Sequence, residues 1–154
     1  MAFRVERRDD ADAGFTLIEL LVVMIIIGIL AAIAIPTFLN QRKNGWNAAA
    51  KTDVANFALA VESSAVDQGG DYTKVITSST AGDVLSGGAN MIAGFSFSPT
   101  PSVTIYNGAA PTTTSYCLVG NNSNVSDGWW TYSKAKGGLQ VASAATLAAA
   151  EAAC

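Results

Sequence analysis

The chain has 154 residues, of which 50% are hydrophobic and 14% charged, with a formal net charge of −3 at pH 7. No basic patch emerges, so we expect no strong direct binding of nucleic acid by the isolated chain. The sequence contains no histidine, no acidic cluster with metal-ligand spacing and no phosphate-binding glycine loop. These features argue against an enzyme and predict no cofactor and no metal site.

A short charged leader, residues 1–14, precedes a long apolar stretch from Phe15 to Ile35. As a helix this stretch would be roughly 30 Å long, which matches the hydrocarbon core of a bilayer. Glu19 lies inside it, and a deeply inserted acid costs about 2–3 kcal/mol or more. We therefore treat Glu19 as a functional candidate. The alternative is that Glu19 stays at the headgroup level, where Thr16 and Glu19 could form a capping box at the helix start.

A secretory signal peptide is a second interpretation of this stretch. The sequence Ala32-Ile33-Ala34 imitates a signal-peptidase site. However, the apolar run is long for such a signal, and Glu19 lies within it. Cleavage after Ala34 is therefore the less favoured reading.

Residues 36–68 keep a helical period but become polar after Pro36. Apolar residues recur every three or four positions, as on one face of an amphipathic helix: Trp46, Ala50, Val54, Phe57, Val61 and Ala65. Lys51, Asp53 and Glu62 lie off this stripe. We expect the helix to end at Asp67–Gly70, where glycine can adopt the left-handed closing conformation.

Residues 71–154 differ in composition and are expected to form an antiparallel sheet of three to five strands, packed on the apolar face of the helix. The overall fold class is therefore α+β. The expected strands are Met91–Ser98, Val103–Tyr106, Tyr116–Gly120 and Trp129–Lys134. The expected turns are Asn107-Gly108, Asn121-Asn122, Asp127-Gly128 and Gly137-Gly138. Residues 142–153 are rich in alanine, and a short helix or a docked coil is equally compatible with them.

Three neighbouring aromatic residues, Trp129, Trp130 and Tyr132, could form a stacking platform for sugar or DNA. The favoured interpretation is different, because alternate residues of a strand point to opposite faces. On that reading one aromatic side chain lies in the core or at a subunit contact, and its neighbour lies outside.

The sequence Gly14-Phe15-Thr16-Leu17-Ile18-Glu19, followed by the apolar run, resembles the signature of type IV prepilins. This signature is shared with pseudopilins of type II secretion and with competence pilins. The resemblance covers residues 1 to about 65. It implies a pilin-like fold in which the hydrophobic half of the helix protrudes and the amphipathic half packs on the sheet.

The resemblance implies roles for three residues at the start of the run. A prepilin peptidase would cleave between Gly14 and Phe15, and the same enzyme would N-methylate Phe15. Glu19 of one subunit would then meet the Phe15 amine of a neighbour in the filament. Two opposite buried charges compensate each other's desolvation only when they are well paired.

Gly28 and Pro36 are a tolerated glycine and a proline kink on the plain reading, both common in membrane helices. The resemblance implies that the helix between them, Ile29 to Ile35, loses its hydrogen bonds in the filament. One departure from the family pattern is the presence of acids, among them Asp12, close to the cleavage site.

The two cysteines, Cys117 and Cys154, are expected to pair, because an even number in an exported chain favours a disulfide. A disulfide near the C-terminus is also a recurring feature of pilins. Two independent thiols are the alternative. Residues 71–154 would then be a head closed by a C-terminal disulfide loop.

The resemblance as a whole implies the major subunit of a type IV pilus, a homopolymer that serves adhesion, motility or DNA uptake. Its partners would be the prepilin peptidase, a platform protein, and the assembly and retraction ATPases. The chain would cross the bacterial cytoplasmic membrane once, with its N-terminus in the cytoplasm, and then enter a surface pilus. The alternatives are a type II secretion pseudopilin, a minor or competence pilin, and a monomeric membrane-anchored ligand-binding protein.

Overall fold

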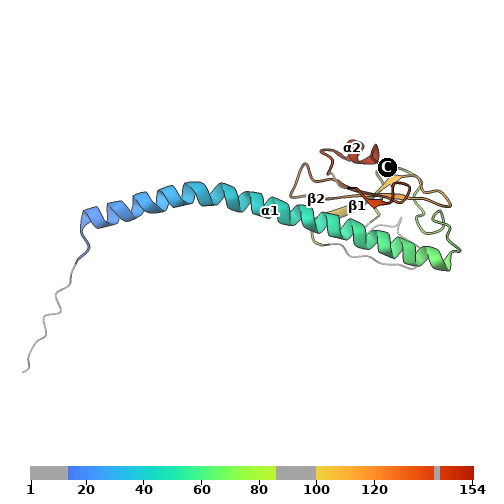
Figure 1. Cartoon of the computed structure of the whole chain (residues 1–154), viewed down its shortest axis with the longest axis horizontal. Helices are drawn as coiled ribbons and strands as arrows, with labels where there is room; N and C mark the ends of the chain where they lie inside the picture. The colour runs from blue at the N-terminus through green and yellow to red at the C-terminus, as the bar shows by residue number, and fades with distance from the viewer. Residues whose placement is uncertain (1–13, 86–99, 141–142) are drawn as a thin grey trace, which may run out of the picture. The chain divides into compact units, whose positions relative to one another are not determined.

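The computed structural model describes residues 14–85, 100–140 and 143–154, so the expected strand at Met91–Ser98 lies outside the described residues. The chain divides into two units, Met1–Leu39 and Asn40–Cys154. The elements, in chain order, are α1 (Leu17–Asp67), β1 (Val103–Ala109), β2 (Cys117–Asn122), β3 (Trp130–Ser133), β4 (Gly138–Leu139) and α2 (Leu147–Glu151) (Figure 1).

Helix α1 runs for 51 residues and includes Pro36, which confirms the long helix expected from the sequence. It ends as predicted, with Gly69 and Gly70 at φ values of 68° and 84°. The Gly70 N–H donates to the Ala65 carbonyl at 2.8 Å, and the Gly69 N–H donates to the Val66 carbonyl at 3.3 Å. This pair of bonds is a Schellman closure, and only glycine takes its left-handed backbone without steric cost.

The buried face of α1 within the second unit is the stripe predicted from the sequence. Ala50, Val54, Phe57, Val61 and Ala65 are all buried, whereas Trp46 at the end of the stripe is only half-buried.

The expectation that Asp53 lies off the stripe is wrong, because its side chain is buried. Its carboxylate accepts a 2.7 Å hydrogen bond from the Thr100 N–H. The bond supplies a donor to an acid that burial would otherwise leave unsatisfied.

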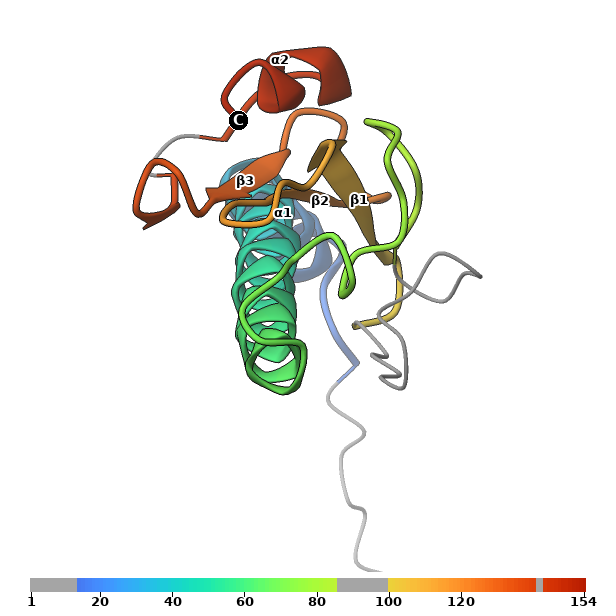
Figure 2. The same ribbon diagram turned by 90° about the vertical axis from the view of Figure 1, so that its right-hand side faces the viewer.

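The four strands form one antiparallel sheet in the order β1-β2-β3-β4, which confirms the α+β fold class. In the second unit, α1 covers one face of the sheet and α2 lies on the other face (Figure 2). Ile105 and Leu118 are fully buried among the core residues of α1. Gly120 pairs with Ile105, and a Cβ on Gly120 would overlap Val54 of α1. A glycine in β2 therefore lets the helix approach the sheet closely.

Three of the predicted turns are wrong in whole or in part. Asn107 and Gly108 lie inside β1, where the register shifts between Asn107 and Ala109. Asn121 and Asn122 form the end of β2 instead of a turn. Gly137 does close a turn at φ 84°, but Gly138 already begins β4.

The Asn107 side chain explains why the strand overrides the turn signal there. Its Nδ2 donates to the carbonyls of Ser78 and Thr80, each at 3.1 Å. These bonds tie β1 to the segment that follows α1. Local turn propensity is too weak to compete with such long-range pairing.

A polar cluster around Glu62 fastens the end of α1 to the rest of the second unit. The Glu62 carboxylate accepts hydrogen bonds from the hydroxyls of Tyr72 at 2.7 Å and Tyr116 at 3.0 Å. The Lys134 ammonium donates to both carboxylate oxygens, at 2.9 and 3.1 Å. The four side chains come from α1, from the loop after it, and from positions flanking β2 and β3.

Titration of Glu62 is shaped by this environment. Partial burial acts to raise the pKa of Glu62, but the hydrogen bonds from Tyr72, Lys134 and Tyr116 outweigh it and hold the pKa below its usual value. Burial also raises the pKa of the Tyr116 hydroxyl, which keeps that hydroxyl a donor. Because the pKa of Glu62 is lower in the folded chain than in the unfolded chain, the carboxylate stabilises the fold at pH values above its unfolded-state pKa. This contribution is lost as the pH falls through the folded-state pKa.

We predict that Glu62→Gln lowers the free energy of unfolding by about 1–2 kcal/mol at pH 7, because the negative charge is lost and one of the two oxygens that accept from Lys134 becomes an NH2 donor. The difference between the variant and the unmodified chain should shrink as the pH falls from the unfolded glutamate pKa of about 4.3 through the lower folded pKa, because the wild-type carboxylate becomes protonated over that range. Urea unfolding at pH 7 and at lower pH measures both effects. Asp127→Asn is the matched control: its ion pair with Lys43, at 3.8 Å, is solvent-exposed and should contribute less than about 0.5 kcal/mol. An equal loss from both variants would contradict the prediction.

Candidate functional site

The start of α1 brings Thr16 and Glu19 together in a capping box. The Thr16 N–H and its hydroxyl both donate to Glu19 Oε2 at 2.8 Å. In return, the Glu19 N–H donates to Thr16 Oγ1 at 3.3 Å. The Thr-x-x-Glu spacing predicted this arrangement, which satisfies donors that the first turn of a helix leaves free.

Only one oxygen of the Glu19 carboxylate is occupied by these bonds. Within residues 14–85, 100–140 and 143–154, no donor is recorded on Oε1. Shallow grooves lined by Phe15, Glu19 and Val23 run along the helix surface beside the carboxylate. The acid therefore keeps an acceptor for a further donor.

The apolar side chains around Glu19 are exposed in the single chain. Large hydrophobic side chains between Phe15 and Leu39 are between 47% and 89% exposed. By length and composition α1 can cross a membrane, although an N-terminal signal sequence meets the same criterion. An exposed apolar surface of this extent marks an interaction with lipid or protein.

Gly28 and Pro36 both lie within an unbroken α1. A Cβ on Gly28 would have nothing within 4 Å. Pro36 has no N–H to donate along the helix, and the Thr37 hydroxyl next to it donates to the Ile33 carbonyl at 3.0 Å. The expected loss of helix between these residues concerns the filament, and it stays a prediction.

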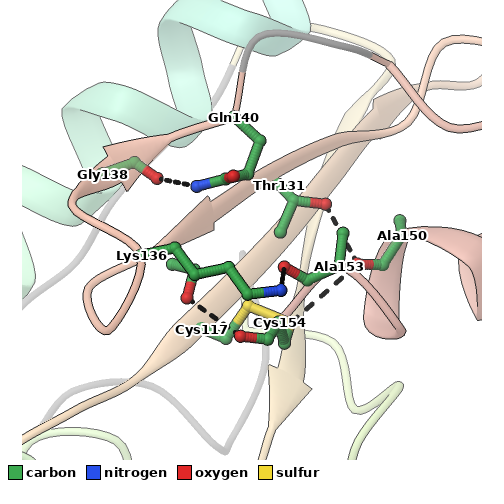
Figure 3. Close-up of a disulfide and its surroundings, with 9 residues drawn as sticks. Cys117, Thr131, Lys136, Gly138, Gln140, Ala150, Ala153 and Cys154 are labelled. Atoms are coloured by element: carbon green, nitrogen blue, oxygen red, sulfur yellow. Dashed lines mark hydrogen bonds between the residues drawn. A yellow bond between two sulfur atoms is a disulfide. The ribbon is translucent and has the colours of Figure 1, made fainter.

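The two cysteines are joined by a disulfide, with a Cα–Cα distance of 5.7 Å (Figure 3). Cys117 begins β2, and Cys154 follows α2. The C-terminal segment is also fixed by hydrogen bonds to neighbouring strand residues: the Thr131 hydroxyl donates to the Ala150 carbonyl at 3.1 Å, and the Ser133 hydroxyl donates to the Cys154 carbonyl at 3.1 Å.

Gly108 makes room for the disulfide, which the sequence did not indicate. A Cβ at this position would lie 2.6 Å from Cys154 Sγ and 2.8 Å from Val119 Cγ2. Real Cβ atoms do not approach so closely, so a larger residue would displace the bridge or Val119. The glycine is thus a packing requirement inside a strand.

The aromatic residues Trp129, which precedes β3, and Trp130 and Tyr132 within β3 do not form a common platform. Trp130 and Tyr132 pack against the core, and the Tyr132 ring stacks on Tyr116 with centroids 5.8 Å apart. Trp129 instead contacts Tyr106, with centroids 5.5 Å apart. This arrangement supports the alternating interpretation over the stacking platform.

Sequence reasoning missed the partners of Glu62. The residues that meet at this carboxylate are 10 to 72 positions away along the chain. No local pattern links them, so only the fold brings them together.

The chain is an α+β protein with an exposed apolar helix, and the first turn of this helix is closed by the Thr16–Glu19 capping box. Residues 10–35 match the family model described as the prokaryotic N-terminal methylation motif. The chain is 47% identical over 60 residues to the type IV major pilin protein PilA of Myxococcus xanthus (strain DK1622), covering 39% of this chain and 27% of that protein. It is 34% identical over 105 residues to the type IV major fimbrial protein FimA of Dichelobacter nodosus, covering 67% of this chain and 61% of that protein.

The methylation motif and the similarity to these two relatives support a type IV pilin. The matched segments span less than two thirds of the length of either relative. No solved structure matches the chain significantly. Both relatives are named as pilus or fimbrial proteins, so the resemblance seen in the sequence is confirmed at the level of the family.

We predict that replacing Cys117 and Cys154 together by serine lowers the free energy of unfolding by about 4 kcal/mol, because the bridge closes a long loop in the unfolded chain. Urea unfolding of the double variant and of the reduced unmodified chain measures this loss. The two should agree, since both lack the same bond. Intact-mass analysis with and without reductant verifies the bridge, and a mass unchanged by reduction would contradict it.

Proposed function

We propose that this chain is a structural subunit, the major pilin, of a type IV pilus. It would polymerise noncovalently into a surface filament that serves adhesion, motility or DNA uptake. The observation that carries the proposal is the methylation motif at residues 10–35, which extends over most of the exposed apolar part of α1. The names of the two relatives support it.

Processing would come first. A prepilin peptidase cleaves between Gly14 and Phe15 and methylates the new amine of Phe15. Before assembly, α1 holds the subunit in the cytoplasmic membrane, with the N-terminus on the cytoplasmic side. A platform protein and the assembly ATPase then move it into the pilus, and a retraction ATPase reverses the process.

Glu19 would set the pairing between subunits. Its capping box leaves Oε1 open, and the amine of Phe15 in a neighbouring subunit is a donor of opposite charge. Pairing the two in an apolar surrounding offsets the cost of burying each charge alone. A head-to-tail contact of this kind, which does not close on itself, generates an open helical filament.

The disulfide favours a pilin over a type II secretion pseudopilin. Major pseudopilins of type II secretion typically carry an acid-rich calcium site in the head and no cysteine pair. Here Cys117 and Cys154 are bridged, and in the described part of the chain no group of three or more acids, cysteines or histidines could hold a metal ion.

We predict that Glu19→Ala abolishes filaments but leaves membrane insertion and leader cleavage intact. Electron microscopy of sheared surface filaments and membrane flotation measure the two effects, and mass analysis should still find a methylated Phe15. Glu19→Gln separates the two roles of the acid, because glutamine also serves in a capping box but carries no charge. Loss of filaments in both variants supports the ion pair. Normal filaments from Glu19→Gln would assign Glu19 to helix capping alone.

We also propose that residues 29–35 lose their helical hydrogen bonds in the assembled filament. Gly28 weakens the helix intrinsically, and Pro36 removes one of its hydrogen bonds. A filament reconstruction should show extended density, above 1.5 Å rise per residue, between Gly28 and Pro36. The part of α1 packed on the sheet, residues 46–65, should remain helical and serves as the internal control. Unbroken helix across residues 28–36 would contradict the proposal.

A further inference from the structure

The first basic side chains after Glu19 are Arg42 and Lys43, and residues 20–41 carry no charged side chain. As a helix these residues extend over roughly 33 Å, slightly more than the hydrocarbon core of about 30 Å. If the charged Glu19 lies near the inner surface of the membrane, with the N-terminus on the cytoplasmic side as proposed above, Arg42 reaches the opposite headgroup region. A basic pair therefore stands where the helix leaves the lipid.

Arg42 and Trp46 form a structural unit at this position. They lie one turn apart on α1, and the Arg42 guanidinium carbon stands 4.7 Å from the centroid of the Trp46 ring. Arg42 is exposed and Trp46 is half-exposed. Tryptophan is favoured at the membrane–water interface. A guanidinium that stacks on a ring still has N–H groups free to bind phosphate oxygens.

The surrounding charges distinguish Arg42 from its neighbour. Lys43 lies 3.8 Å from the Asp127 carboxylate, which comes from the loop between β2 and β3. No carboxylate among the described residues forms a recorded ion pair with Arg42. Among the described residues, Arg42 is thus the cation of this pair whose charge is not offset by a carboxylate.

We propose that Arg42 and Trp46 bind the head groups of anionic phospholipids at the outer surface of the membrane while the subunit is unassembled. This inference rests on the proposed insertion of α1 in the membrane. The contact fixes how far the helix is inserted. Each basic residue near an anionic surface contributes about 1 kcal/mol, which corresponds to about a fivefold preference for an anionic lipid over a zwitterionic one.

The test uses the full chain reconstituted in phosphatidylcholine vesicles that also contain phosphatidylglycerol. One lipid at a time carries a nitroxide at the top of its acyl chain, and quenching of Trp46 fluorescence gives the relative association of the two lipids. The contribution of Trp46 is isolated by comparison with Trp46→Phe, because the chain has 3 tryptophans. We expect phosphatidylglycerol to be preferred about fivefold and the preference to disappear in Arg42→Gln.

Two further variants sharpen the test. Lys51→Gln is the matched control, because Lys51 also stands over a tryptophan ring, 5.1 Å from the centroid of Trp130. It lies roughly 13 Å further along the helix, so its loss should leave the lipid preference unchanged. Asp127→Asn removes the partner of Lys43 and should increase the preference for phosphatidylglycerol.

The outcomes separate the inference from the proposed function. If the chain floats with the vesicles after an alkaline wash but Trp46 is not quenched, or Arg42→Gln keeps the preference, the lipid contact is wrong and membrane insertion stands. If the chain does not float with the vesicles, insertion fails and the inference fails with it. Inorganic phosphate added to the detergent-solubilised chain should not change Trp46 fluorescence, and an equal response there would assign the site to free phosphate instead of lipid.

Discussion

The structure depends on a single helix, α1, that has to satisfy two different surroundings along its length. Between Ala50 and Ala65 one face of the helix is buried against the sheet, and the opposite face is polar enough for water. Between Leu20 and Leu39 the helix carries no charged side chain, and its large apolar side chains are exposed. A helix of the second kind is stable only in lipid or among other apolar helices. One half of α1 therefore belongs to the core of the folded head, and the other half requires an external apolar partner.

Much of this architecture can be predicted from local sequence patterns. The 3.6-residue period between Trp46 and Ala65 predicts the buried stripe, and alternation at period two predicts β1 and β3. Two glycines predict the end of α1, which their left-handed backbone confirms. The capping box was visible as a Thr-x-x-Glu spacing. These predictions are correct because each structure is determined by residues close together in the sequence.

The predictions that were wrong concern residues whose structure is determined by contacts between distant parts of the chain. Asn107-Gly108 is a strong turn signal, yet it lies inside β1. Asn107 is held there by two carbonyls of the segment after α1, and Gly108 is required by the disulfide. The sequence pattern places Asp53 and Glu62 off the apolar stripe of an amphipathic helix. Each instead accepts hydrogen bonds from residues at least 10 positions away, and these partners are not visible in any local pattern.

The charged groups of α1 divide into two kinds according to where their partners come from. Glu62 is satisfied within the chain by two tyrosines and a lysine, so it stabilises the head whatever the surroundings. Glu19 has one oxygen bound by Thr16, and Arg42 has a ring but no recorded carboxylate partner among the described residues. These two groups bracket the uncharged stretch of residues 20–41. An incompletely paired charge beside an apolar surface is costly. A surrounding that offers partners to Glu19 and Arg42, either lipid or neighbouring subunits, therefore lowers the free energy of the subunit in that surrounding. A subunit that exchanges lipid for neighbouring subunits must change these partners, whereas the recorded partners of Glu62 all lie within the chain itself.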